Sequence, residues 1–241
     1  MIPKIVHYCW FGQTSKNTEI KSNLEEWKKK LPEYEFIEWN EKNFDINSMP
    51  FVKEAYDRKK FAFVSDVASL YALIEYGGVY LDTDIEVVKN FTNIIDNYTA
   101  AFSLENNNNV VATSFIASKK KHPIILKLYD QYKAMRFIDN KGNEVTIPNT
   151  VYLTEILKKE GFNIENEFQI LKNVALFPEE YFSSYDLEIG KPQYKKNTFT
   201  VHHFSGSWES KGFHFKKMIK KYLITLLGES IFIKLKRVIK K

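Results

Sequence analysis

Hydrophobic residues follow two patterns along this chain, short compact runs and longer stretches with helical spacing, and the two alternate. Short runs of aliphatic and aromatic residues bounded by turn-forming residues are typical of strands. They predict strands at Lys4–Cys9, Tyr34–Trp39, Val79–Asp82, Ala100–Leu104, Val110–Ala117, Gln169–Leu171, Val174–Phe177 and Phe199–His203. Apolar residues at helical spacing predict helices at Thr18–Leu31, Val52–Tyr76, Pro123–Phe137 and Thr150–Glu160.

The alternation of strands and helices indicates the class of fold. Chains of this kind usually cover a central sheet with helices on its faces. We therefore predict an α/β fold built on a mainly parallel central sheet. No internal repeat or low-complexity linker divides the pattern, so residues 1–212 are expected to form one domain.

The remaining residues, 213–241, form a basic tail with a different pattern. Pairs of lysines alternate with pairs of apolar residues at helical spacing, and from Lys216 onward the chain holds nine Lys or Arg and only Glu229 as acid. This predicts one or two basic amphipathic helices. Such helices bind anionic membrane surfaces, although they also pack on a domain with their lysines in water.

Composition limits the possible functions. The 241 residues are 44% hydrophobic, which is enough for a sizeable core, and the net charge of +5 does not suggest a nucleic-acid partner. The single cysteine, Cys9, lies in an apolar run and is expected to be a buried structural thiol. Because no secretory signal or spanning segment is recognisable, we expect a cytoplasmic protein. The basic tail leads us to expect that it is peripheral on the inner face of the cytoplasmic membrane.

The candidate chemistry begins at Asp82 and Asp84, which follow Gly77-Gly78 and a short apolar strand. On an extended segment residues two apart share a face, so both carboxylates are expected to converge on one cation. Oxygen ligands of this kind suit Mg²⁺ or Mn²⁺. An isolated Asp-x-Asp is also common as a turn with solvated charges, and the pair alone does not decide between the two.

Three further segments accompany the carboxylates in a distinctive order. They are the opening Ile2–Gly12 (IPKIVHYCWFG), the helical Phe63–Leu70 (FVSDVASL) and the late His202–Trp208 (HHFSGSW). Together with Tyr76–Asp84 they resemble glycosyltransferase family 32, whose relatives include yeast initiating mannosyltransferases, bacterial capsule and lipopolysaccharide glycosyltransferases and, distantly, large clostridial glucosylating toxins. The resemblance covers about residues 1–208. It implies a single GT-A-type, Rossmann-like domain that binds a nucleotide sugar.

The resemblance implies a set of metal ligands. Asp84 would bind the cation directly, and Asp82 would reach it through water and hold the donor ribose. His203 would be a third ligand; because His202 should face the opposite way on an extended segment, only one of the two can join the metal. An imidazole ligand favours Mn²⁺ over Mg²⁺. A strand-end histidine bonded to backbone is the alternative role for His203.

The resemblance also implies a donor site. The expected donor-binding residues are Trp10, Ser65, Asp66, Tyr80, Asp82, Asn149 and Trp208, with Trp10 stacking on the base and Trp208 closing over the diphosphate. Asp66 would bind hydroxyls of the sugar, and it completes the expected catalytic set with Asp82 and Asp84. Relatives commonly carry an arginine three residues later, where this chain has Ser69, so the sugar stays open. Apart from the resemblance, Glu105-Asn106 after a strand and Asn149-Thr150 at a helix start are candidate contacts to donor or acceptor, because polar residues at strand ends line such clefts.

The implied function is transfer of a hexose from a nucleotide sugar, expected to be a UDP-sugar, to a saccharide or lipid-linked acceptor. The resemblance implies retention of the anomeric configuration and a place in the synthesis of bacterial surface polysaccharide, such as capsule, O-antigen or lipopolysaccharide. Two alternatives stay open. One is a metal-dependent nucleotidyl or phosphosugar transferase that uses the same carboxylates, and the other is a non-catalytic, membrane-associated scaffold of a polysaccharide assembly complex.

Overall fold

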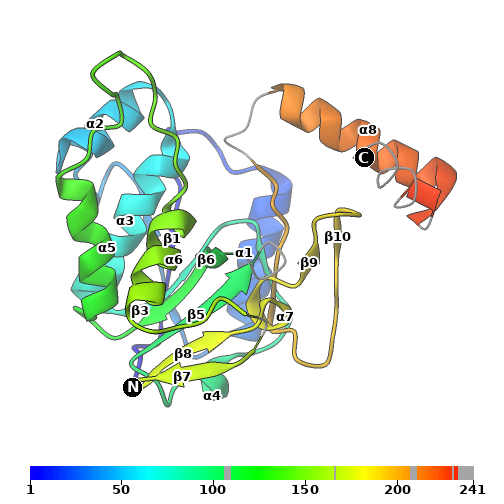
Figure 1. Ribbon diagram of the computed structural model, residues 1–241, viewed down its shortest axis with the longest axis horizontal. Coiled ribbons are helices and arrows are strands. Elements are labelled where there is room, and N and C mark those ends of the chain that lie inside the picture. The colour runs from blue at the N-terminus through cyan, green and yellow to red at the C-terminus, as the bar shows by residue number, and fades with distance from the viewer. Residues whose placement is uncertain (106–109, 166, 207–210, 230, 233–241) are drawn as a thin grey trace.

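A computed structural model of the chain describes residues 1–105, 110–165, 167–206, 211–229 and 231–232. Figure 1 shows the arrangement of its elements. The strands are β1 (Ile5–Cys9), β2 (Glu35–Trp39), β3 (Gly78–Leu81), β4 (Ile85–Val87), β5 (Ala100–Glu105), β6 (Val110–Ser118), β7 (Gln169–Leu171), β8 (Val174–Phe177), β9 (Tyr185–Asp186), β10 (Lys191–Pro192) and β11 (Thr200–His202). The helices are α1 (Thr18–Lys30), α2 (Pro50–Asp57), α3 (Phe61–Tyr76), α4 (Thr92–Ile95), α5 (Pro123–Lys133), α6 (Asn149–Lys159), α7 (Glu179–Phe182) and α8 (Lys211–Leu227).

A seven-stranded sheet forms the centre of the fold, in the order β2-β1-β3-β6-β5-β8-β7. Five of its strands run in one direction, whereas β6 and β7 run in the other. The sheet is therefore mainly parallel, as the alternation of elements predicts. A separate two-stranded sheet pairs β11 with β4 and brings the end of the described domain back to the carboxylates.

Helices cover both faces of the central sheet, and each face has its own core. The apolar residues of α2, α3, α5 and α6 pack on one face, and those of α1, α4 and α7 pack on the other. Strand β3 illustrates the division, because Tyr80 belongs to the first core while Val79 and Leu81 belong to the second. This alternation is the normal consequence of strand geometry.

The turn between α3 and β3 determines where the carboxylates lie. Gly77 ends α3 in the left-handed region with φ +67°, and Gly78 follows with φ +108°. A Cβ on Gly78 would lie 2.5 Å from the carbonyl oxygen of Ile5, so only glycine fits between β3 and β1 here. The buried His7 fixes the same turn, since its Nε2 lies 2.8 Å from the Gly77 carbonyl oxygen. The end of the helix predicted at Tyr76 is confirmed.

The predicted elements differ from the observed ones in two respects. The helical stretch expected over Val52–Tyr76 is two helices, α2 and α3, separated at Arg58–Lys60, where Lys59 takes a left-handed φ of +57°. The elements β4, α4, α7, β9 and β10, each two to four residues long, are not predicted. Cys9 is buried, as expected.

The tail begins within α8, which stands at one side of the body, above the β9–β10 hairpin in Figure 1. Ile224 is buried, the Lys220 ammonium lies 2.6 Å from the Leu187 carbonyl oxygen, and Lys191 pairs with Glu229 at 2.6 Å. The helical tail predicted from residue 213 is thus present over the described residues; residues 233–241 lie outside them. No helix in the described part of the chain is both long and apolar enough to cross a membrane.

Candidate active site

Asp82 and Asp84 lie at the end of β3, in a tight turn. β3 stops at Leu81, and the Ile85 amide donates to the Asp82 carbonyl at 2.9 Å, so Asp82-Thr83-Asp84 is not extended as predicted. The carboxylates converge because the turn folds them together. Asn23 of α1 fixes this turn by donating its side-chain amide to the Thr83 carbonyl at 2.9 Å.

His202 completes a group of three possible metal ligands with the two aspartates. One ligand atom from each of Asp82, Asp84 and His202 lies within 4.8 Å of the others. The antiparallel pairing of β11 with β4 produces this arrangement, since it sets His202 opposite Ile85, the residue after Asp84. The His202 Nε2 atom is 3.5 Å from Asp84 Oδ1.

His203 is not part of this group, which corrects the ligand expected from the sequence. Its Nε2 lies 2.8 Å from Glu86 Oε2, while its backbone amide donates to the Asp84 carbonyl at 3.2 Å. The β11–β4 register pairs Val201 with Glu86, and residues two apart on a strand share a face. His203 therefore shares a face with Glu86, and His202 points to the opposite side.

The electrostatics of the group suit a divalent cation. Burial raises the pKa of Asp82 to about 6, with the charge of Asp84 adding to the effect. Burial would also raise the pKa of Asp84, but the charge of His202 and hydrogen bonds from His202 and Ser205 hold it below its usual range. Burial opposes the charged form of His202, yet Asp84 and Glu105 raise its pKa well above the usual value. The carboxylates thus stabilise a positive charge at this point of the site. Two carboxylates and one imidazole also form a donor set that fits Mn²⁺.

Further hydrogen bonds fix the orientation of the aspartates. The backbone amide and hydroxyl of Ser205 both donate to Asp84 Oδ2 at 2.8 Å. The buried Tyr80 hydroxyl donates to Asp82 Oδ1 at 2.7 Å. Tyr80, expected to bind donor, is thus placed to orient Asp82. Ser205 is a site residue that was not predicted from the sequence. Its place in the segment His202–Trp208, three residues after His202, could have indicated that it lies at the site.

A second polar cluster lies around Asp66. Its Oδ1 accepts from the Asn149 side-chain amide at 2.8 Å, and Asn149 Oδ1 accepts in turn from the Thr113 hydroxyl at 2.6 Å. Burial raises the pKa of Asp66 well above its usual value, and the charge of Asp82 adds to the effect. The structure therefore joins two predicted donor-binding residues, Asp66 and Asn149, through a direct contact. Thr113 was not predicted, because no local motif surrounds it.

The two serines near Asp66 bond to their own helix. Ser65 donates to the Phe61 carbonyl at 3.0 Å, and Ser69 donates to the Asp66 carbonyl at 2.9 Å. These are local side-chain to backbone bonds of the kind that serine makes inside helices. Ser69 thus supplies no charge toward Asp66 in the position where relatives carry arginine.

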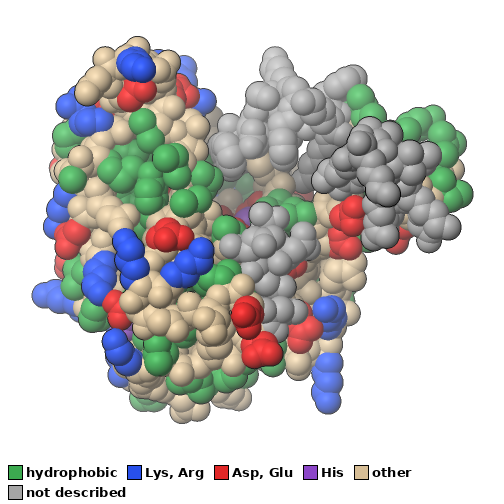
Figure 2. All heavy atoms as spheres, in the orientation of Figure 1, with side chains coloured by type: hydrophobic (Ala, Val, Ile, Leu, Met, Phe, Trp, Pro, Cys, Tyr) green, Lys and Arg blue, Asp and Glu red, His purple; other side chains and the backbone are tan. Residues whose placement is uncertain are grey.

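Two tryptophans, Trp10 and Trp208, are expected to contact the donor. Trp10 follows β1 directly, is partly exposed, and donates its indole N–H to the Thr14 carbonyl at 2.7 Å. Trp208 lies outside the described residues. Figure 2 shows acidic and histidine side chains deep in a hollow beside the helical part of the body.

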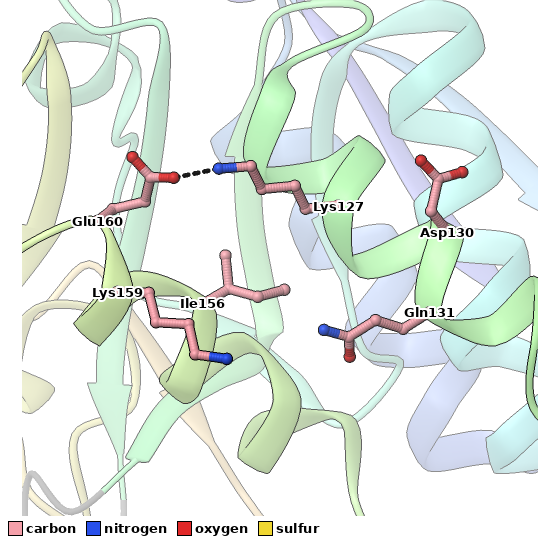
Figure 3. A pocket seen from close by; sticks show the side chains of 6 residues that line it. All are labelled: Lys127, Asp130, Gln131, Ile156, Lys159 and Glu160. Carbon is pink, nitrogen blue, oxygen red and sulfur yellow. Dashed lines mark hydrogen bonds and ion pairs between the residues drawn. The ribbon is translucent and has the colours of Figure 1, made fainter.

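A separate cavity of about 540 Å³ lies between α5 and α6. Its lining comprises Lys127, Asp130, Gln131, Ile156, Lys159 and Glu160, and an ion pair joins Lys127 to Glu160 (Figure 3). It shares no residue with the carboxylate group, and its walls are mostly the charged outer faces of the two helices. We assign the functional site to the carboxylate group.

Comparison with known proteins agrees with this geometry. Residues 17–101 match the family described as "Glycosyltransferase sugar-binding region containing DXD motif". The similarity to this family is thus shown for residues 17–101. The matched segment includes Asn23, Asp66, Asp82 and Asp84, whereas His202 lies outside it.

Two fungal proteins that are similar to this chain are described as enzymes of mannosyl transfer. One is mannosyl phosphorylinositol ceramide synthase SUR1 of Saccharomyces cerevisiae, 26% identical over 157 residues, which are 59% of this chain and 39% of that protein. The other is inositol phosphoceramide mannosyltransferase 3 of Schizosaccharomyces pombe, 24% identical over 135 residues, which are 53% of this chain and 36% of that protein. The chain therefore aligns with well under half the length of either relative.

A solved structure supports the class of fold. The PaToxG glycosyltransferase superposes with a TM-score of 0.51 at 18% identity, over 66% of this chain and 69% of that one. The α/β fold with a mainly parallel central sheet is thus similar to that of GT-A glycosyltransferases, as the sequence predicts.

Proposed function

We propose that this protein transfers a hexose from a nucleotide-sugar donor to a saccharide or lipid-linked acceptor in a metal-dependent reaction. The observation that carries the proposal is the convergence of Asp82, Asp84 and His202 at the end of β3. The family of residues 17–101 supports it independently. Mn²⁺, or Mg²⁺, is the proposed metal.

The residues have separate tasks in this proposal. Asp84 and His202 would hold the cation, with Asp82, oriented by Tyr80, completing the site. A bound divalent cation would neutralise the charge that develops on the diphosphate as it leaves. Asp66, oriented by Asn149, would accept hydrogen bonds from hydroxyls of the sugar. Trp10 would offer its ring to the base, and Trp208 would close over the diphosphate.

The proposed step breaks the bond between the anomeric carbon and the diphosphate oxygen and forms a bond from that carbon to an acceptor hydroxyl oxygen. The products are the glycoside, a nucleoside diphosphate and the proton of the acceptor hydroxyl. We propose retention of configuration, a UDP-sugar donor and a role in bacterial surface polysaccharide synthesis. The descriptions of the fungal relatives name mannosyl transfer, so mannosyl donors belong in the same screen.

Release of nucleoside diphosphate tests the proposal. UDP-, GDP- and CMP-sugars are incubated with the protein and Mn²⁺, with and without EDTA, and the products are separated by chromatography. We expect metal-dependent release of a nucleoside diphosphate, or of CMP from a CMP-sugar, in the presence of an acceptor or, more slowly, water. With a UDP- or GDP-sugar, nucleotidyl transfer would instead release sugar 1-phosphate, and phosphosugar transfer would release a nucleoside monophosphate. Absence of turnover with every donor would favour the scaffold.

A matched pair of variants localises the activity. Asp84→Asn keeps the shape of the side chain and removes the charge that faces His202, so we expect loss of both Mn²⁺ binding and turnover. Asp57→Asn is the control, because Asp57 is an exposed helical aspartate paired with Lys53. Equal turnover in the two variants would contradict the metal assignment.

We also propose that α8 rests on an anionic membrane surface, which would make the protein peripheral on the inner face of the cytoplasmic membrane. Met218, Tyr222 and Leu226 are four residues apart on one helix face and are 59%, 66% and 65% exposed. Ile224, two positions from both Tyr222 and Leu226, is on the opposite face and is buried. The excess of basic residues in the tail supports an anionic partner.

Vesicle sedimentation tests the membrane proposal. We expect binding to vesicles that contain phosphatidylglycerol, weaker binding to neutral vesicles, and loss of binding in a Tyr222→Ser, Leu226→Ser variant. Ile170→Ser is the control, since Ile170 is a 54% exposed apolar residue on β7, away from the tail. Unchanged binding of the double variant would refute the role of α8.

A further inference from the structure

Glu105 is an acidic side chain in an unusual place. It is the last residue of β5, and it is only 6% exposed. Burying a carboxylate is costly unless a charged or hydrogen-bonding partner satisfies it. Its Oε2 lies 3.2 Å from His202 Nδ1, a residue 97 positions later in the chain.

His202 is therefore held from two sides. Its Nδ1 faces Glu105 at 3.2 Å, and its Nε2 faces Asp84 at 3.5 Å. The ring also packs against Phe204, with centroids 3.9 Å apart. These contacts fix the plane of the imidazole as well as its position.

The identity of the nitrogen that faces the aspartates decides whether the ring can bind a cation. A metal ligand needs a free lone pair, so Nε2 must carry no proton when it coordinates. The proton then resides on Nδ1, where a carboxylate is the best acceptor. Such an outer carboxylate fixes the tautomer and raises the basicity of the ligating nitrogen.

We propose that Glu105 is a positioning residue that holds His202 with Nδ1–H toward itself and Nε2 toward the metal. This inference rests on the proposed function and deepens it, because it assigns an outer residue to the site. Glu105 is not a ligand itself: the group of possible ligands found among the described residues contains Asp82, Asp84 and His202. Glu105 acts through the ring.

Mn²⁺ affinity is the first measurement, because it requires no donor or acceptor. Titration of the full chain with Mn²⁺ is followed by electron paramagnetic resonance. Loss of an outer hydrogen bond typically costs roughly 10- to 100-fold in metal affinity, which is the decrease we expect for Glu105→Ala. Glu105→Gln keeps an acceptor oxygen without the charge, so a smaller decrease is expected. Glu86→Gln is the matched control, since Glu86 makes the equivalent contact with the neighbouring His203.

Two further measurements separate positioning from a general structural effect. If Glu105 acts only through His202, the double variant Glu105→Ala, His202→Ala binds Mn²⁺ no more weakly than His202→Ala alone. In spectra of ¹⁵N-labelled histidine, the His202 resonances of Glu105→Gln should show a changed distribution of the proton between the two nitrogens. Thermal unfolding confirms that each variant is folded.

The outcomes distinguish this inference from the proposed function. Wild-type protein that fails to bind Mn²⁺ would overturn the proposed metal site. Wild-type protein that binds Mn²⁺ while Glu105→Ala binds it equally well would overturn the role of Glu105 and leave the site intact. If Glu105→Ala does not fold, Glu105→Gln decides, and unchanged affinity together with unchanged histidine spectra would refute the inference.

Discussion

Acidification should destabilise the fold through His7, a fully buried histidine on β1. The His7 Nε2 lies 2.8 Å from the Gly77 carbonyl oxygen, and Nδ1 accepts from the Trp39 indole N–H at 3.1 Å. Both contacts require a neutral ring with its proton on Nε2. A second proton on Nδ1 would face the Trp39 indole N–H, which is also a donor. It would also place a positive charge in the core, where no water can solvate it.

The size of the effect follows from the two pKa values. Burial lowers the pKa of His7 from the usual 6.5 to about 4, although the bond to Gly77 opposes this. Because the unfolded chain binds the proton more tightly, the stabilising contribution of neutral His7 is complete above pH 6.5 and is lost as the pH falls toward 4. The difference between the two pKa values corresponds to about 3 kcal/mol, of which about 2 kcal/mol is lost by pH 5.

Urea unfolding at pH 8 and pH 5 measures this effect. A His7→Gln variant, which cannot titrate in this range, corrects for the other groups that change charge. We expect the free energy of unfolding of the wild type to fall by about 2 kcal/mol more than that of the variant over this interval. Parallel pH dependences in the two proteins would refute the reasoning. They would mean that His7 is protonated as readily in the native state as in the unfolded one.

Three other predictions concern residues that position the site. Gly78→Ala should lower the free energy of unfolding by roughly 1–3 kcal/mol, measured as an earlier urea midpoint, because its Cβ would clash with the backbone of β1 at a positive φ. Trp27→Phe removes the indole N–H that donates to the Ile85 carbonyl at 2.8 Å; a loss of about 1–3 kcal/mol by calorimetry is expected, and an unchanged midpoint would argue against this contact. Asn149→Ala takes from Asp66 the amide that orients it, so the KM for the donor should rise while Mn²⁺ affinity stays constant.

Local patterns in the sequence predicted many of the strands and helices. The strand at residues 4–9, the helix at 18–31 and the strand at 79–82 agree with β1, α1 and β3 to within a residue or so at each end. Each depends on side chains that are neighbours in sequence, and their periodicity is set by the backbone alone. The break between α2 and α3 was missed, because the segment Asp57–Lys60 (DRKK) contains no glycine or proline to mark the end of a helix.

Long-range contacts decided the composition of the site. The alternation along a strand shows that His202 and His203 face opposite ways, but it does not show which face meets the carboxylates. The pairing of β11 with β4 settles that choice. The contact of Asn149 with Asp66 spans 83 positions, and neither residue alone indicates the other.

The sequence by itself determined that two carboxylates follow a glycine turn and a buried strand, since those features are local. Only the tertiary structure determined that a tight turn brings them together, that His202 rather than His203 joins them, and that Glu105 stands behind its ring. The physical reason is that hydrophobic alternation fixes the direction of each side chain relative to its own strand. The register between strands far apart in the sequence fixes which side chains meet.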